Sequence, residues 1–283
     1  MFSKKDIFLS CDLQQEFNAK GFVKIKLFTP EEMQPLLTCF DKYADAHFIK
    51  DGGFHHTTHH TNNWDLIADV SKELIHLLKP RLDGVFTNYA ILGGNFILKD
   101  YGTDTEFVPH QDWTLMDENK YHSANLWLPL HDLTSNNGML RFLPGSMHLV
   151  RNLRMAPHYP DLFGKIMPLV YPHMQTVPLQ FGEAVVFDCC VLHGSFANTS
   201  DTYRKNIIMG IYSADAEFKF YYNTQQGNPP LIEEYHISPD EFLTFAVGDR
   251  PVGRKPDRIF PYEFPVFTEQ EFLAQYPVEH RLV

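Results

Sequence analysis

The spacing of apolar positions predicts helices in the first third of the chain. Residues 12–20 resemble a short helix that Gly21 ends, and residues 22–28 alternate apolar and basic side chains, as a half-buried strand does. Residues 29–32, Thr-Pro-Glu-Glu, predict another helix start, with Thr as the cap, Pro in the first turn and a glutamate three residues after the cap. The apolar face of that helix is Met33, Leu36, Leu37, Phe40 and Tyr43. A second helix is expected over residues 71–78, ending near Pro80.

From residue 85 onward the pattern changes to short apolar runs separated by turn residues. Glycine pairs, an Asn-Asn-Gly turn and a Pro-Gly-Ser turn separate these runs, a pattern typical of a β-sandwich or barrel. An insertion at residues 155–169 has a short helix expected near 160–167. After Asp215 the strand signals weaken, and the tail is expected to wrap the barrel or cover a cleft mouth. The candidate strands are residues 85–92, 95–99, 122–130, 139–143, 184–187 and 205–212.

The 283 residues contain no clear interdomain linker, so we expect one domain that is mainly β with flanking helices. Its parts are a helical region at about 1–84, a β core at about 85–214 and a C-terminal wrap or lid at 215–283. The formal net charge of −11 argues against nucleic acid as the main partner, because that binding needs a basic field. No apolar run is long enough to cross a membrane and the four cysteines form no disulfide-like framework, so a cytoplasmic location is expected. The pattern carries no signal for the oligomeric state.

His110 and Asp112 are the first candidate metal ligands. Residues two positions apart on an extended strand point to the same face, so both side chains could bind one divalent ion. A second imidazole would complete two histidines and one carboxylate, the ligand set of non-haem Fe(II) oxygenases, and His193 is the best candidate. Because the chain has 15 histidines, each one alone is weak evidence.

Arg204 follows His193 by eleven positions and could bind a carboxylate through two hydrogen bonds. The alternative is a surface salt bridge. His110, Asp112, the Asn-Asn-Gly turn, a Leu-Pro-Gly-Ser loop, His193 and Arg204 follow one another in a fixed order, which is more specific than any of them alone.

In these segments, over residues 85–212, the sequence resembles the phytanoyl-CoA dioxygenase family of Fe(II)- and 2-oxoglutarate-dependent oxygenases. The resemblance implies a double-stranded β-helix, or cupin-like jelly roll, with His110, Asp112 and His193 binding iron. It implies that Arg204 and Ser195 bind the distal carboxylate of 2-oxoglutarate. Trp127 and Asn95 stand where the family has further co-substrate contacts, although this chain has an amide where a methionine is common. The alternatives are a core aromatic for Trp127 and a turn hydroxyl for Ser195.

The resemblance implies a reaction in which O₂ and 2-oxoglutarate are consumed and succinate and CO₂ are released. Related halogenases have a small residue at the position of Asp112, so its carboxylate favours hydroxylation, here of an aliphatic carbon in a small organic substrate. Desaturation or demethylation, a jelly-roll binding protein with a structural metal, and a cupin-type isomerase or dioxygenase remain alternatives. The substrate itself is not specified by the fold family.

Residues 54–64 are rich in histidine and are expected to form a polar loop over the cleft. A second metal site and a plain surface loop are the alternatives. Such loops often carry specificity. The residues expected to contact the prime substrate are His55, His56, His59, Trp64 and Trp113, the last directly after Asp112.

Overall fold

The computed structural model describes residues 4–43, 54–245, 248–251 and 253–277. Its largest sheet has six antiparallel strands in the order β1-β8-β5-β10-β3-β2. A second sheet has four antiparallel strands in the order β4-β9-β6-β7. The large sheet contains β1 Phe22–Lys26, β2 His55–Thr57, β3 Tyr89–Lys99, β5 Ser123–Pro129, β8 Glu183–Asp188 and β10 Arg204–Ser213, and the smaller one β4 Phe107–His110, β6 Leu140–Phe142, β7 Gln175–Val177 and β9 His193–Ser195.

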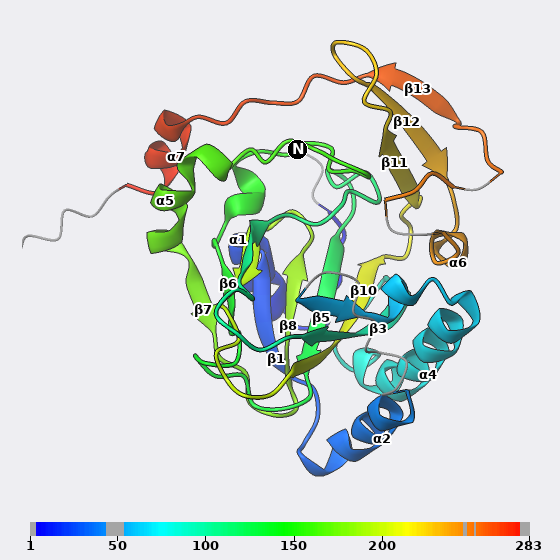
Figure 1. Cartoon of the computed structure of the whole chain (residues 1–283), viewed down its shortest axis with the longest axis vertical. Coiled ribbons are helices and arrows are strands. Elements are labelled where there is room, and N and C mark those ends of the chain that lie inside the picture. Colours follow the sequence, from blue (N-terminus) through cyan, green and yellow to red (C-terminus); the bar gives the residue numbers. More distant parts are fainter. Residues whose placement is uncertain (1–3, 44–53, 246–247, 252, 278–283) are drawn as a thin grey trace, which may run out of the picture.

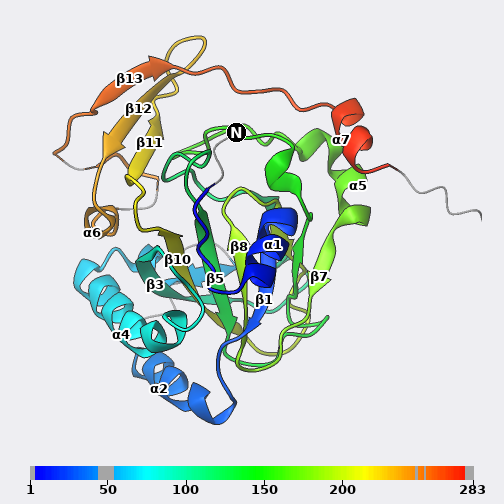
Figure 2. The same ribbon diagram turned by 180° about the vertical axis from the view of Figure 1, so that it is seen from behind.

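Three helices cover the outer face of the large sheet (Figures 1 and 2). They are α1 Cys11–Lys20, α2 Gln34–Lys42 and α4 Trp64–Leu82, and α2 follows a 3-10 turn at Glu31–Met33. Figure 2 shows α1 in front of β1 and β8. The expected capping pair is present, since the backbone amides of Thr29 and Glu32 each donate to the other residue's side chain, over 2.9 and 3.4 Å.

The alternation of the strands divides the molecule into two apolar layers. Ile207, Met209 and Ile211 of β10 pack against the helices, as do Phe96 and Leu98 of β3. The opposite face meets the smaller sheet in a second cluster, as expected for a jelly roll. That cluster comprises Phe22, Trp127, Leu133, Leu140, Phe142, Val177, Leu179, Val185, Phe187 and Val191.

The C-terminal region forms a third sheet, although strand signals in its sequence are weak. Its strands are antiparallel in the order β11-β12-β13, with bounds Lys219–Asn223, Leu231–His236 and Arg258–Pro261. The short helix α6, Pro239–Phe242, follows β12, and the chain then crosses the molecule from β13 to α7, Glu269–Gln275, beside α5, Met167–Val170 (Figure 1). Phe272 of α7 is fully buried in the cluster that includes Phe163 and Val170.

Four further sequence expectations are corrected. Residues 85–92 and 95–99 are not two strands: β3 runs through Gly93 and Gly94 because β10 pairs with it on both sides of that pair. The helix expected at 71–78 begins at Trp64, where Asn63 caps it, and continues past Pro80 to Leu82. The helix of the insertion lies later than 160–167, at Met167–Val170 after a 3-10 turn. Residues 55–64 are not a loop, but form β2, a 3-10 turn and the start of α4.

No helix among the described residues is both long enough and apolar enough to span a membrane.

Candidate metal centre and its two cavities

His110 and His193 lie directly opposite each other where β4 pairs with β9. Asp112 lies two residues beyond the end of β4, so it is not on the strand as the sequence suggested; its backbone N–H donates to the carbonyl of Cys189, over 2.8 Å. The Asp112 carboxylate oxygens lie 3.7 Å from His110 Nε2 and 3.8 Å from His193 Nε2. One ligand atom from each residue lies within 4.8 Å of the others, a group that could hold a metal ion.

Backbone carbonyls fix the tautomers of both histidines. His110 Nδ1 lies 2.9 Å from the carbonyl oxygen of Val108, and His193 Nδ1 lies 3.0 Å from that of Val191. Because a carbonyl only accepts, each Nδ1 carries the proton and each Nε2 keeps a lone pair toward Asp112. The arrangement fits a divalent metal without a change of tautomer.

Aromatic side chains shield the His193 ring. Phe187 lies 4.5 Å from it between ring centroids, and Phe142 stacks on it at 6.0 Å. Burial lowers the pKa of His193 to about 4, so the imidazole is neutral at physiological pH, as a metal ligand must be.

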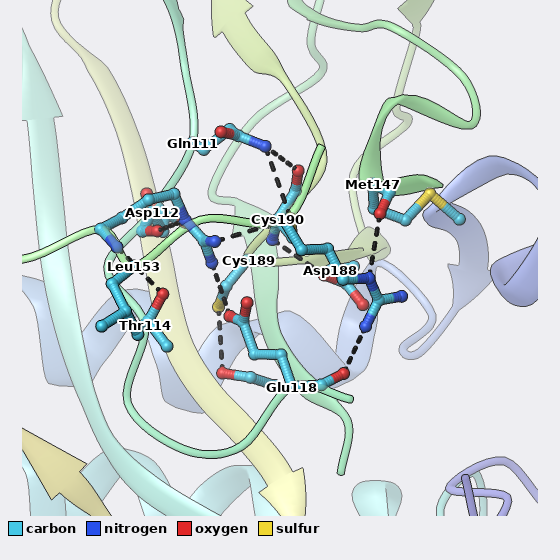
Figure 3. Close-up of polar contacts among 12 residues, drawn as sticks. Gln111, Asp112, Thr114, Glu118, Met147, Leu153, Asp188, Cys189 and Cys190 are labelled. Carbon is cyan, nitrogen blue, oxygen red and sulfur yellow. Dashed lines mark hydrogen bonds and ion pairs between the residues drawn. The ribbon is translucent and has the colours of Figure 1, made fainter. Parts of the chain in front are cut away.

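Asp112 is held from two sides by groups outside the metal-binding motif. Asn125 Nδ2 donates to a carboxylate oxygen over 2.8 Å, and Arg154 Nε donates to the backbone carbonyl over 2.5 Å. Arg154 is fully buried and pairs with the buried carboxylate of Glu118 at 2.5 Å. Asp112, Glu118 and Cys190 thus belong to one polar network (Figure 3).

An inner cavity of about 220 Å³ lies on one side of the metal group and contains a buried cation, Arg204. Its Nη1 donates to the carbonyl of Gly138 over 2.7 Å, its guanidinium lies 5.1 Å from the Trp127 ring, and its Nε has no partner. Within the described residues, no carboxylate pairs with it. Burial lowers the pKa of Arg204 to about 9, so it stays charged at neutral pH. A buried, unpaired guanidinium fits an anionic co-substrate.

Lys99 is a second buried basic side chain, and it is absent from the residues predicted from the sequence. It lies opposite Arg204 in the β3–β10 register, and its Nζ donates to Ser195 Oγ at 2.7 Å and the Phe196 carbonyl at 2.6 Å. Burial, and secondly Arg204, lowers the pKa of Lys99 to about 6. The sequence did contain one signal for Lys99. Alternate residues of a strand share a face, so Lys99 lies on the same face as Ile97 and the predicted contact Asn95.

Trp127 and Ser195 line the inner cavity, as does Ile97. Asn95 does not line it. Asn95 lies two residues before Ile97, and its side-chain oxygen is buried without a hydrogen-bond partner. The structure therefore places Trp127 and Ser195 in the same cavity as Arg204, whereas Asn95 lies outside the lining of that cavity, two residues before Ile97 on β3.

An outer cavity of about 330 Å³ shares His110 and Asp112 with the inner one. Trp113, which follows Asp112 directly, lines it. The metal group therefore stands in the common wall of two cavities. One holds the buried arginine, and the other is lined mostly by apolar side chains.

The histidine-rich segment is divided between different environments. His55 lines the inner cavity. His56 Nε2 lies 2.9 Å from a carboxylate oxygen of Asp100. His59 packs its ring against Trp64 and Phe242, and Trp64 is 37% exposed. None of these four residues lines the outer cavity.

The family model described as phytanoyl-CoA dioxygenase (PhyH) matches residues 17–206, about two thirds of the sequence. The chain belongs to this family. Phytanoyl-CoA dioxygenase 1 of Oryza sativa subsp. japonica is 30% identical over 128 residues, covering 44% of this chain and 46% of the relative. A Danio rerio phytanoyl-CoA dioxygenase domain-containing protein 1 is 33% identical over 124 residues, covering 41% and 43%. The matched segment thus spans less than half the length of either curated relative.

Solved structures share the family's jelly roll. The 2-oxoglutarate-dependent carbocyclase SnoK of nogalamycin biosynthesis aligns with a TM-score of 0.55 at 20% identity, covering 74% of this chain and 86% of SnoK. The epimerase SnoN aligns with 0.53 at 17%, covering 92% and 93%. HygX of Streptomyces hygroscopicus, solved with nickel, 2-oxoglutarate and hygromycin B, aligns with 0.51 at 14%, covering 73% and 88%. At these identities the likeness shows the fold. The donor set of His110, Asp112 and His193 fits the metal and co-substrate with which such neighbours are crystallised.

Proposed function

We propose that the protein is an Fe(II)- and 2-oxoglutarate-dependent dioxygenase that hydroxylates an aliphatic carbon of a small organic molecule. The observation that carries this proposal is the position of the His110, Asp112 and His193 group between two cavities. One cavity offers a carboxylate site at Arg204, and the other offers an apolar space to a substrate. The reaction would consume R–H, O₂ and 2-oxoglutarate and yield R–OH, succinate and CO₂.

In this proposal His110, Asp112 and His193 hold iron, which supplies the oxidising chemistry when bound. The carbonyls of Val108 and Val191 hold the proton of each neutral imidazole on Nδ1, which leaves Nε2 for the metal, and Asn125 orients the carboxylate of Asp112. These contacts set the ligand geometry before metal arrives.

The co-substrate would place its distal carboxylate at Arg204. Ser195 accepts from Lys99, so its own hydroxyl hydrogen is free to donate to that carboxylate. Trp127 would pack against the carbon chain of 2-oxoglutarate. Asn95 would be a further contact to the co-substrate, from its position on β3. His55 lies on this side of the metal group, whereas Trp113 lies on the side proposed for the prime substrate.

The test measures succinate from 2-oxoglutarate with Fe(II) and O₂, and uses mass spectrometry to detect a substrate product that has gained one oxygen. Replacing His110, Asp112 or His193 by Ala should abolish both signals and lower bound iron. His76→Ala, at an exposed position of α4, is the matched control. A substrate product that has lost two hydrogens, with no oxygen gained, would indicate desaturation. Absence of succinate from iron-loaded protein with every substrate tried would contradict an oxygenase.

A further inference from the structure

The outer cavity presents a wall almost without charge. Four of its polar side chains have partners: Asn125 donates to Asp112, Ser123 donates to the Cys189 thiol, and Gln111 and Tyr159 each donate to a backbone carbonyl. No lysine or arginine of the described residues lines the cavity. The Asp112 carboxylate faces the metal position. The apolar part of the wall includes Leu92, Trp113, Leu115, Met116, Ile211 and Phe242, and Gln111 and Tyr212 also line the cavity.

A β-bulge directs Leu92 into this wall. Gly93 pairs with Gly210 and Ile91 with Ile211, so Leu92 is the extra residue between them. A methyl group at Gly210 would lie 2.8 Å from Leu92 Cβ, so the glycine leaves the room that the bulged side chain occupies. Bulges often redirect a side chain beside an active site. Here the redirected side chain is the apolar Leu92, which lines the outer cavity.

The opposite wall is built by the C-terminal region. Phe242 of α6 packs against Phe218 and Phe220, with ring centroids 5.5 and 6.0 Å apart, in the aromatic cluster beneath the third sheet. Burial, and secondly the carboxylate of Asp240, raises the pKa of Tyr212 in the same wall. The carboxylate of Asp240 therefore acts on the Tyr212 side of the cavity, whereas Asp112 and the cation Arg154 act on Tyr159.

We propose that the prime substrate is an uncharged, hydrocarbon-rich molecule, and not a carboxylate or a coenzyme A thioester. The inference rests on the proposed function, because it assigns the outer cavity to the prime substrate. A carboxylate would lose its hydration against this wall without a cation to replace it, and Asp240 would repel it. A volume of about 330 Å³ is at the lower end of small-molecule sites and too small for a coenzyme A group.

The experiment uses the full chain with Fe(II), O₂ and 2-oxoglutarate and a matched series of compounds. Octyl, citronellyl, cyclohexylmethyl and phenylpropyl skeletons are each supplied as the alcohol, the carboxylate and the coenzyme A thioester. For the skeletons that stimulate succinate release, the alcohol should show a kcat/KM about tenfold or more above its charged counterparts. An equal or better carboxylate or thioester overturns the inference, and so does a series in which no member stimulates.

Succinate formed in the absence of a prime substrate distinguishes failure of the proposed function from failure of the substrate-class inference. If the iron-loaded protein releases none under any condition, the proposed function itself is wrong. If it does release succinate but charged compounds are preferred, only the assignment of the substrate class is wrong.

Two cavity variants provide a second readout. Leu92→Ala and Trp113→Ala should raise the KM for the preferred alcohol about tenfold, and Leu92→Ala should leave the KM for 2-oxoglutarate and the substrate-independent succinate rate unchanged. Leu9→Ala, at a position that is 57% exposed, is the matched control. Unchanged kinetics with the alcohol in both variants would contradict the assignment of the outer cavity to the prime substrate.

Discussion

At the scale of single residues, Arg204 and Lys99 are two basic side chains buried beside each other; with pKa values of about 9 and about 6, Arg204 is charged at neutral pH and Lys99 is mainly neutral. No described carboxylate forms an ion pair with either. Burying unpaired charge is costly, and an enzyme that binds a dianion recovers that cost only when the co-substrate is present. The two residues therefore carry separate predictions.

Arg204→Ala is expected to raise the KM for 2-oxoglutarate by roughly thirtyfold or more, since losing one partner of a buried charge pair costs about 2 kcal/mol or more. Arg204→Lys should recover part of the loss, because an ammonium cannot make the two-pronged contact. Arg81→Ala, which removes an exposed arginine paired with Glu32, is the control. An unchanged KM for 2-oxoglutarate in Arg204→Ala would contradict the proposal that Arg204 binds its distal carboxylate.

Lys99 is expected to make stability depend on pH. Its pKa is about 6 in the folded chain and near 10.5 when unfolded, so between these values the unfolded chain binds one more proton. Stability must then rise with pH, by up to about 1.4 kcal/mol per unit. Without ligands, Lys99→Met should remove this slope, measured as the difference in unfolding free energy between the two proteins from pH 7 to 9. Parallel curves would mean that Lys99 stays protonated in the fold.

At the scale of elements, the metal group depends on how closely β4 and β9 approach. Gly194 lies between His193 and Ser195, and a methyl group there would lie 2.5 Å from the carbonyl oxygen of Phe107. A side chain would therefore force the two strands apart at the point where His110 faces His193.

Gly194→Ala should lower iron affinity about tenfold or more, because the two imidazoles no longer share one metal position. Gly84→Ala is the matched control, since its added methyl group would meet nothing closer than 3.4 Å. Iron titration with circular dichroism separates lost affinity from lost fold. Wild-type affinity in a folded Gly194→Ala protein would contradict the close-approach argument.

The loops behind Asp112 are joined by the Arg154–Glu118 pair, which lies in the interior. Arg154→Met should cost about 3–5 kcal/mol, because it leaves the Glu118 carboxylate buried and uncompensated. The double variant Arg154→Met/Glu118→Met should be more stable than that single variant. Urea unfolding measures both, and a double variant that is less stable than Arg154→Met would show that the pair is not the source of the cost.

At the scale of the whole molecule, two sheets, the covering helices and the C-terminal region (Figure 1) surround the candidate metal group and its two cavities. A ligand that binds only the folded chain stabilises it in proportion to its occupancy. The metal should therefore raise the stability of the fold, and the co-substrate should raise it further once the metal is bound.

Under nitrogen, Fe(II) should raise the thermal midpoint, and 2-oxoglutarate should raise it further. Each ligand contributes about 2.7 kcal/mol at a hundred times its Kd. Arg204→Ala should keep the response to metal and lose most of the response to 2-oxoglutarate. Equal 2-oxoglutarate shifts in both proteins would place the co-substrate away from Arg204.

Local patterns were sufficient for much of the molecule. Five of the six strands of the large sheet were visible in the sequence, β3 as two separate runs, whereas β2 lies in a segment expected to be a loop. The helix faces of α2 and α4 follow a 3.6-residue spacing, because burial on one face imposes a period. His110, Asp112, His193 and Arg204 could be proposed because their order and spacing resemble a family motif. The structure brings all four together around one pair of cavities.

Tertiary pairing decided the rest. Asn125 and Arg154 had no local signal, because each is defined by a partner far away in the chain, such as Glu118 at 36 positions from Arg154. The β3 bulge exists only in register with β10, and the third sheet only through the pairing of its strands. Sequence alone determined which residues could serve as ligands and which faces are apolar, since these are properties of side chains and their period. Long-range packing decided which cations are buried without partners and which wall each cavity has, because desolvation and register depend on residues brought together only by the fold.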